Sequence, residues 1–175
     1  MSMQPTHSSK RILLPVRGWF ILLTLALGMF ANMLPLGRLP GLPDWLALTL
    51  TFWCIREPFK VGMAAAFLAG IVMDVGSASV MGQHSLAYVL LAFAAGGLSR
   101  RILGFPLLQQ AMQILPLLLG TQLVMLAARM AGGADFPGLP YFLGSFSAAL
   151  LWPPLTYLLL LPQYQPVEKD ENRPI

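Results

Sequence analysis

Charged side chains are scarce in this sequence. Only 10% of its 175 residues are Asp, Glu, Lys or Arg, against roughly 25% in soluble domains. Three long stretches, 61–99, 102–128 and 131–167, contain Asp74 and Asp135 as their only formally charged residues. Each stretch exceeds the roughly 20 apolar residues that a helix needs to cross a bilayer. A water-soluble fold cannot bury this much apolar surface, so the composition excludes a soluble domain and predicts a membrane protein.

Two further absences narrow the fold. Strand-like alternation of polar and apolar residues is missing, and a membrane segment must satisfy its backbone hydrogen bonds as a helix or in a closed barrel. The sequence therefore predicts helices. The single cysteine, Cys54, excludes an intramolecular disulfide. The first apolar run follows basic residues, as in a signal peptide, but it lacks a cleavage site of the A-x-A type and is interpreted as a retained helix.

The sequence does contain six apolar segments, separated by proline, glycine and charged residues. They cover residues 18–36, 44–55, 61–80, 85–99, 110–130 and 142–161. We therefore predict an all-α fold, a polytopic transmembrane bundle of about six helices. Its expected parts are a cytoplasmic N-terminal tail at 1–17, a six-helix transmembrane domain at 18–161 and a cytoplasmic C-terminal tail at 162–175.

The positions of the basic residues predict the orientation, because positively charged loops stay in the cytoplasm. With both termini inside, nine of the eleven basic residues lie on the cytoplasmic side, and only Arg38 and Arg129 lie outside. These cations are spread over several short loops, which indicates membrane topology and not nucleic-acid binding. We call the basic residues of the two inner loops the cytoplasmic collar: Arg56, Lys60, Arg100 and Arg101.

The third segment carries small residues at every fourth position. Small side chains at this spacing allow neighbouring membrane helices to approach closely. Four residues advance about 400° around a helix, so the row drifts by about 40° per step and only its middle, about 66–78, can face one neighbour. The members of this small-residue stripe, all candidate partner-interface or structural residues, are Gly62, Ala66, Gly70, Asp74, Ala78 and Gly82.

Asp74 is the charged member of the stripe. A carboxylate at membrane depth costs about 2.5–3.5 kcal/mol on insertion scales, so it normally faces protein or a wet cavity. One alternative is contact with a partner. The other is that Asp74 ends its helix and accepts hydrogen bonds from the turn at 76–79. A proton relay is the weaker hypothesis, because no second carboxylate is expected at membrane depth to receive the proton.

Motifs of the common enzyme classes are missing. The sequence has no H-E-x-x-H, G-x-S-x-G, P-loop or G-x-G-x-x-G pattern, and no Cys/His spacing for a metal. We therefore predict a protein that is not an enzyme and that has no catalytic, cofactor-binding or metal-binding residues.

Several short motifs follow one another through the second to fourth segments, with one more near the end of the chain. They are Leu42-Pro43-Asp44-Trp45, Trp53, Gly62, Phe67, Gly70, Asp74-Val75, Gly82-Gln83-His84-Ser85-Leu86 and Leu151-Trp152-Pro153. In the order and spacing of these motifs, and in its length and topology, the chain resembles the MreD family of bacterial rod shape-determining membrane proteins.

The resemblance implies a non-enzymatic scaffold of the bacterial inner membrane, within the elongasome that carries out peptidoglycan biosynthesis along the lateral wall and maintains cell shape. The partners it implies, besides the lipid bilayer, are the one-span protein MreC, the filament MreB, RodA and a penicillin-binding transpeptidase. Neither a cofactor nor nucleic acid is implied.

The same resemblance provides an alternative function, because the family is similar in fold to the substrate-binding subunits of energy-coupling-factor vitamin transporters. Such a subunit would bind a small molecule in a pocket with a few convergent polar groups. Its docking element, Ala-x-x-x-Ala in the first helix, is replaced here by Ala26 followed by Phe30.

Overall fold

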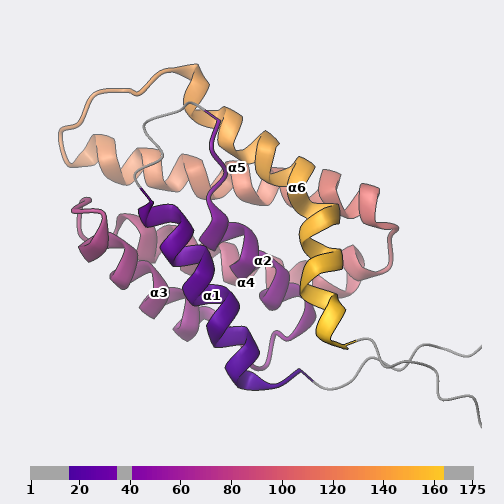
Figure 1. The fold of residues 1–175 in the computed structure, drawn as a ribbon. Coiled ribbons are helices and arrows are strands. Elements are labelled where there is room, and N and C mark those ends of the chain that lie inside the picture. The colour runs from indigo at the N-terminus through magenta and orange to yellow at the C-terminus, as the bar shows by residue number, and fades with distance from the viewer. Residues whose placement is uncertain (1–15, 35–40, 164–175) are drawn as a thin grey trace, which may run out of the picture.

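The described chain is a bundle of six α-helices with two short 3-10 helices (Figure 1). The computed structural model describes residues 16–34 and 41–163, and neither range contains a strand, so the predicted all-α fold is confirmed. Five basic residues used in the topology prediction lie outside the described residues: Lys10, Arg11, Arg38, Lys169 and Arg173. The elements are α1 Gly18–Met33, α2 Trp45–Arg56, α3 Met63–Gly76, α4 Gln83–Leu103, α5 Leu107–Ala131, η1 Leu139–Phe142, α6 Leu143–Leu160 and η2 Leu161–Gln163.

Each predicted segment corresponds to one α-helix, with different ends. α3 stops at Gly76, four residues before the predicted end, and α4 extends at both ends beyond the predicted 85–99. The turn between them contains Ala78 at φ 49° and Gly82 at φ 94°, which are left-handed conformations that a helix cannot include. Hydropathy did not reveal this boundary because the turn is itself built from small and apolar residues.

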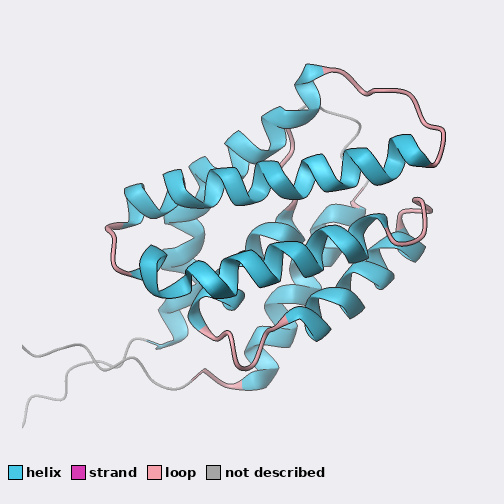
Figure 2. Cartoon of the chain, turned by 180° about the vertical axis from the view of Figure 1, so that it is seen from behind, coloured by secondary structure: helices cyan, strands magenta, loops and turns pink. Residues whose placement is uncertain are grey.

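α2 is the central helix of the bundle. All its residues from 46 to 55 are buried, and it packs against α1, α4, α5 and α6. Around it, α3 packs on α4, α4 on α5 and α5 on α6. Figure 1 shows α1 and α6 in front of α2, and Figure 2 shows the bundle from behind, where only helices and short connections are visible in the described chain.

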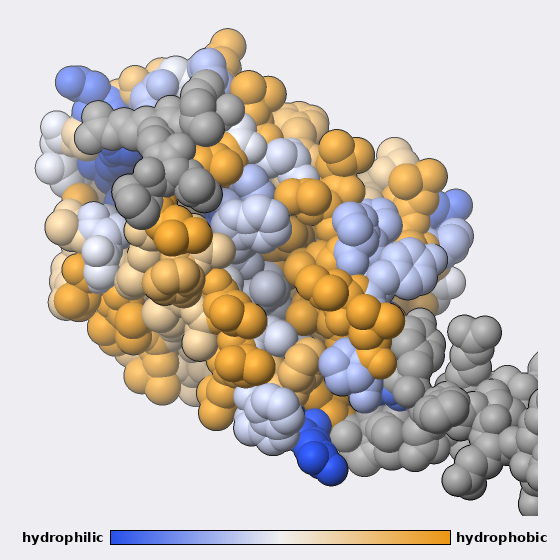
Figure 3. All heavy atoms as spheres, viewed as in Figure 1, coloured by the Kyte–Doolittle hydropathy of each residue, from blue (hydrophilic) through white to orange (hydrophobic). Residues whose placement is uncertain are grey.

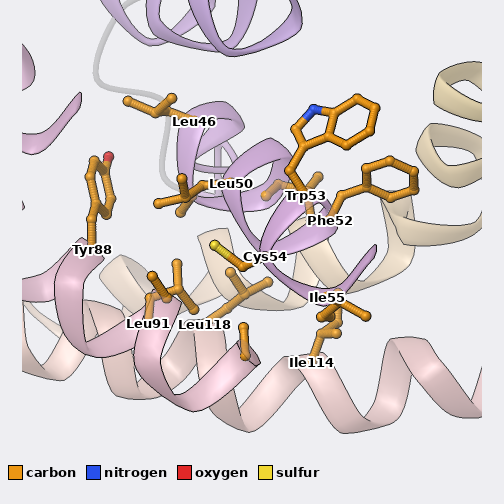
Figure 4. Packing of buried hydrophobic residues seen from close by; sticks show 14 of the residues in the cluster. Leu46, Leu50, Phe52, Trp53, Cys54, Ile55, Tyr88, Leu91, Ile114 and Leu118 are labelled. Carbon is orange, nitrogen blue, oxygen red and sulfur yellow. The ribbon is translucent and has the colours of Figure 1, made fainter. Parts of the chain in front are cut away.

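Large aromatic side chains fill the core around α2 (Figure 4). Phe52 and Trp53 are fully buried, with ring centroids 4.9 Å apart in an edge-to-face arrangement. The Trp53 indole donates to Thr24 Oγ1 at 2.8 Å, which joins α2 to α1 without leaving a buried N–H unpaired. Cys54 is buried in this core as a free thiol.

Three helical stretches are long and apolar enough to cross a membrane: Gln83–Leu103, Leu107–Ala131 and Leu139–Gln163. The helices α1, α2 and α3 are apolar but contain 16, 12 and 14 residues. At about 1.5 Å per residue α2 is about 18 Å long, shorter than a hydrocarbon core of about 30 Å. Because protein surrounds α2, its ends do not need to reach the water on their own.

Apolar side chains cover much of the outside of the bundle, as expected for a protein in lipid (Figure 3). Leu22, Leu68 and Leu150, on three different helices, expose 70%, 63% and 80% of their surface. Polar and charged groups gather instead at the two ends of the bundle. We call the end where α1, α3 and α5 begin the basic end, because it carries the collar, and the opposite end the cavity end.

Candidate functional site

The middle of the small-residue stripe packs inside the chain. Ala66, Gly70 and Asp74 are buried where α3 crosses α4. A Cβ atom on Gly70 would overlap the backbone of Ser85, so only glycine permits this close crossing. The other members of the stripe lie in the connections: Gly62 caps the start of α3 and Gly82 caps the start of α4. Ala78 lies in the α3–α4 turn, so the predicted helix face at 66–78 ends before it. These positions favour the structural alternative for the stripe.

Asp74 joins the end of α3 to the start of α4. The residue is 1% exposed, and its carboxylate accepts bonds from three backbone N–H groups at the start of α4. A negative charge at this position also suits the positive end of the helix dipole. The donors are Gly82 N (3.0 Å), His84 N (2.9 Å), Ser85 N (3.3 Å), Ser79 Oγ (3.0 Å), Ser85 Oγ (3.0 Å) and His84 Nδ1 (2.8 Å).

Asp74 is therefore a helix cap, although not in the form that the sequence suggested. The predicted turn at 76–79 contributes only Ser79, and most of the donors belong to the next helix. His84 Nδ1 must carry a proton, because an ionised carboxylate can only accept hydrogen bonds. The contact of 2.8 Å between His84 Nδ1 and Asp74 Oδ1 holds the His84 ring against Asp74.

Asp44 is a second carboxylate with the same role, at the start of α2. Its Oδ1 accepts from Ala47 N at 2.9 Å and from Asn32 Nδ2 at 2.7 Å, and its Oδ2 accepts from the Tyr88 hydroxyl at 2.9 Å. Asn32 Oδ1 in turn accepts from Trp45 N at 2.8 Å. Asp44 thus links α1, α2 and α4. The sequence signal was present, since Pro-Asp directly before an apolar run is typical of a helix start, but sequence reasoning assigned Asp44 no role.

A cavity of about 710 Å³ opens at this end of the bundle. Each of the six α-helices contributes lining residues from its end, from its start or from the loop before it. These six termini therefore lie at the same end of the bundle, as expected when successive helices run in opposite directions. Sequence reasoning missed the cavity, because the residues come from six separate places in the chain. Its polar lining residues are Asn32, Asp44, Ser77, His84, Gln122, Arg129 and Tyr141.

A second, apolar concavity lies on the side of the bundle, between α1 and α6. We call it the α1–α6 groove; its volume is about 510 Å³. Its floor is Trp45 and Thr49 of α2. Its walls are formed by Phe20, Leu23, Thr24, Leu27, Gly28 and Ala31 of α1 and by Leu155, Leu158, Leu159, Leu161 and Pro162 at the end of the chain's last helices.

The collar residues lie at the basic end. Lys60 donates to Val16 O at 3.0 Å, which ties the α2–α3 loop to the start of α1, and it pairs with Glu57 at 3.3 Å. Arg56 lies over the Phe52 ring, 5.3 Å from its centroid. Arg100 and Arg101 are exposed in the last turn of α4. Across residues 16–34 and 41–163, no group of three or more His, Cys, Asp or Glu side chains is arranged to hold a metal.

Comparison with known proteins agrees with this architecture. Residues 10–161 match the family described as rod shape-determining protein MreD. The Rod shape-determining protein MreD of Haemophilus influenzae is 25% identical over 138 residues, which cover 77% of this chain and 85% of that protein. No solved structure gives a significant match. The family match spans the whole helical bundle, and the chain therefore belongs to the MreD family of rod shape-determining membrane proteins.

Proposed function

We propose that this chain is a non-enzymatic scaffold of the bacterial inner membrane that maintains rod shape by holding an MreC-like one-span partner and the wall-synthesis enzymes together. The main support for this function is the family match over residues 10–161. The bundle also has short connections and extensive exposed apolar helix surface. MreB, RodA and a penicillin-binding transpeptidase are the further partners that membership of the family supports.

We propose that the one-span partner binds in the α1–α6 groove. The middle of the segment 62–78, which the sequence suggested as a partner surface, packs on α4, so only its convex outer side, with Phe67, Leu68 and Val72, stays exposed. The groove instead is concave and apolar, and the small side chain of Ala31 lies in its wall, whereas Gly28 faces α2, where an added Cβ would meet Thr49. A concave apolar surface with small residues lets a helix approach closely, and packing drives helix association in lipid.

The proposed topology places the basic end in the cytoplasm and the cavity end in the periplasm, with six crossings and both termini inside. The collar at one end, with Lys60 bonded to the start of α1, supports it. Reporter fusions at Arg100 and Asp135 test the orientation. We expect a cytoplasmic signal at Arg100 and a periplasmic signal at Asp135, and the reverse result would overturn the topology.

Substitution in the groove tests the scaffold role. Ala31→Phe should fill the groove, reduce recovery of an MreC-like partner from detergent extracts and round the cells. Ala26→Phe is the matched control, because Ala26 is exposed on the same helix and does not line the groove. Equal partner recovery with the two variants, both inserted at normal levels, would show that the groove is not the binding surface.

One observation favours the alternative function, a substrate-binding subunit of a vitamin-type transporter. The end cavity has the size and the convergent polar groups that such a subunit needs. Fold kinship alone does not establish transport. Depletion of the chain distinguishes the two functions, since loss of rod shape supports the scaffold, whereas intact rods with impaired vitamin uptake would support the transporter subunit.

A further inference from the structure

The end cavity is held open by hydrogen bonds within its own walls. Gln122 of α5 donates to Tyr141 O at 3.2 Å and accepts from Ser145 Oγ of α6 at 2.6 Å. Ser147 Oγ donates to Gly41 O at 2.6 Å, which fixes the loop before α2 against α6. With the Asp44 and Asp74 contacts, these bonds connect neighbouring walls around the cavity. The cavity is therefore preformed, as binding sites for small molecules usually are.

Two side chains of the cavity wall can donate hydrogen bonds that no described residue accepts. The Arg129 guanidinium and the Tyr141 hydroxyl have no hydrogen-bond or ion-pair partner among the described residues. Arginine can only donate. The carboxylates near the cavity already have donors of their own, since Asp44 accepts three bonds and Asp74, behind His84, accepts six. Arg129 is therefore a positively charged donor that an anionic group could neutralise.

The size and the apolar part of the lining suit a ligand larger than a simple ion. About 710 Å³ lies within the range of roughly 300–1,000 Å³ found for sites that bind organic molecules. Leu42, Met73, Met125 and Pro137 lie in the wall beside the donors. An inorganic ion would leave these side chains without contact, whereas an organic body would cover them.

We propose that the end cavity binds an organic anion, in which a phosphate or carboxylate group on an apolar body pairs with Arg129 and accepts a hydrogen bond from Tyr141. The planar guanidinium can bind two oxygens of such a group at once. A membrane phospholipid and a water-soluble organic phosphate share this chemistry. The inference goes beyond the scaffold role and does not depend on the α1–α6 groove.

Native mass spectrometry of the full-length chain in a neutral detergent tests the proposal with three probes. Dioctanoyl phosphatidylglycerol represents the lipid source, glycerol phosphate represents the soluble source, and dioctanoylglycerol lacks the anion. We expect at least one phosphate probe to bind, and Arg129→Gln to weaken its binding about tenfold or more. Arg17→Gln is the matched control, since Arg17 is exposed before α1 at the opposite end and should leave binding unchanged.

The three probes distinguish a lipid ligand from a water-soluble one, and their results can overturn the proposal. Binding of phosphatidylglycerol alone assigns a lipid, and binding of glycerol phosphate with the same dependence on Arg129 assigns a soluble ligand. If neither probe binds, if dioctanoylglycerol binds as tightly as phosphatidylglycerol, or if Arg17→Gln weakens binding as much as Arg129→Gln, the proposal is wrong. Should Arg129→Gln fail to fold, Tyr141→Phe provides the test, with a smaller expected loss of binding; unchanged binding in this variant would overturn the role of Tyr141.

Discussion

The two ends of the bundle differ in how side chains bond to the backbone groups at the helix termini. At the cavity end, Asp44 and Asp74 each accept several backbone and side-chain donors, and each connects at least two helices. At the basic end, within the described residues, Lys60 donates to Val16 O, and Gln110 donates to Phe105 O and accepts from the Trp152 indole. The carboxylates therefore stabilise one end from within, whereas the cations of the other end lie largely on the surface, where they are suited to set orientation.

The largest expected effect follows from removing the carboxylate that connects α3 and α4. Asp74→Ala leaves three backbone N–H groups and the buried Ser85 hydroxyl without their acceptor. Breaking a buried charged network of this kind costs about 3–5 kcal/mol. The free energy of unfolding in SDS titration measures the loss. Asp135→Ala, in the exposed loop before α6, is the matched control, and equal losses for the two variants would contradict the difference in role.

A smaller effect is expected where α3 and α4 cross near the same end. In Gly70→Ala the new Cβ meets the Ser85 backbone, so the helices must separate, at a cost of about 1–3 kcal/mol for overpacking. Gly97→Ala is the control, because a Cβ at Gly97 meets nothing within 4 Å. The same unfolding assay compares the two. A neutral Gly70→Ala variant would mean that the crossing is looser than the structure indicates.

The smallest effect is expected at the basic end. Gln110→Leu removes the acceptor of the Trp152 indole at 3.3 Å, and such contacts between membrane helices contribute about 0.6 kcal/mol on average, up to about 1.7. Gln109→Leu, exposed on the neighbouring position, should leave the unfolding free energy unchanged. A loss for Gln110→Leu as large as that for Asp74→Ala would remove the contrast between the two ends.

Most of the fold could be predicted from the sequence because lipid imposes strict rules on composition. Six apolar segments separated by breaker residues predicted six helices, and the described chain contains them. Helix ends were less accurate, as in α3, since the α3–α4 turn is too apolar to be distinguished by hydropathy. The sequence also singled out Asp74 correctly as a buried residue facing protein, because an isolated carboxylate in lipid is costly.

The partners of Asp74 could not be predicted in the same way. Its donors at 82–85 lie after a turn whose path depends on left-handed residues at 78 and 82. The role of Asp44 depends equally on distant residues, because Asn32 and Tyr88 come from two other helices. Residue spacing within one helix contains no information on such contacts.

The sequence by itself determined that the chain is helical, that it belongs in a membrane and which residue types stay out of the lipid, because each of these depends on local composition and on the cost of exposing polar groups. Only the tertiary structure decided that the stripe packs against α4, that α2 is enclosed, and that six helix termini form one cavity with Arg129 and Tyr141 in its wall. The physical reason is that these features arise from the packing of side chains far apart in the chain, and the crossing of two helices is fixed by where close contact is sterically possible, as at Gly70 and Ser85.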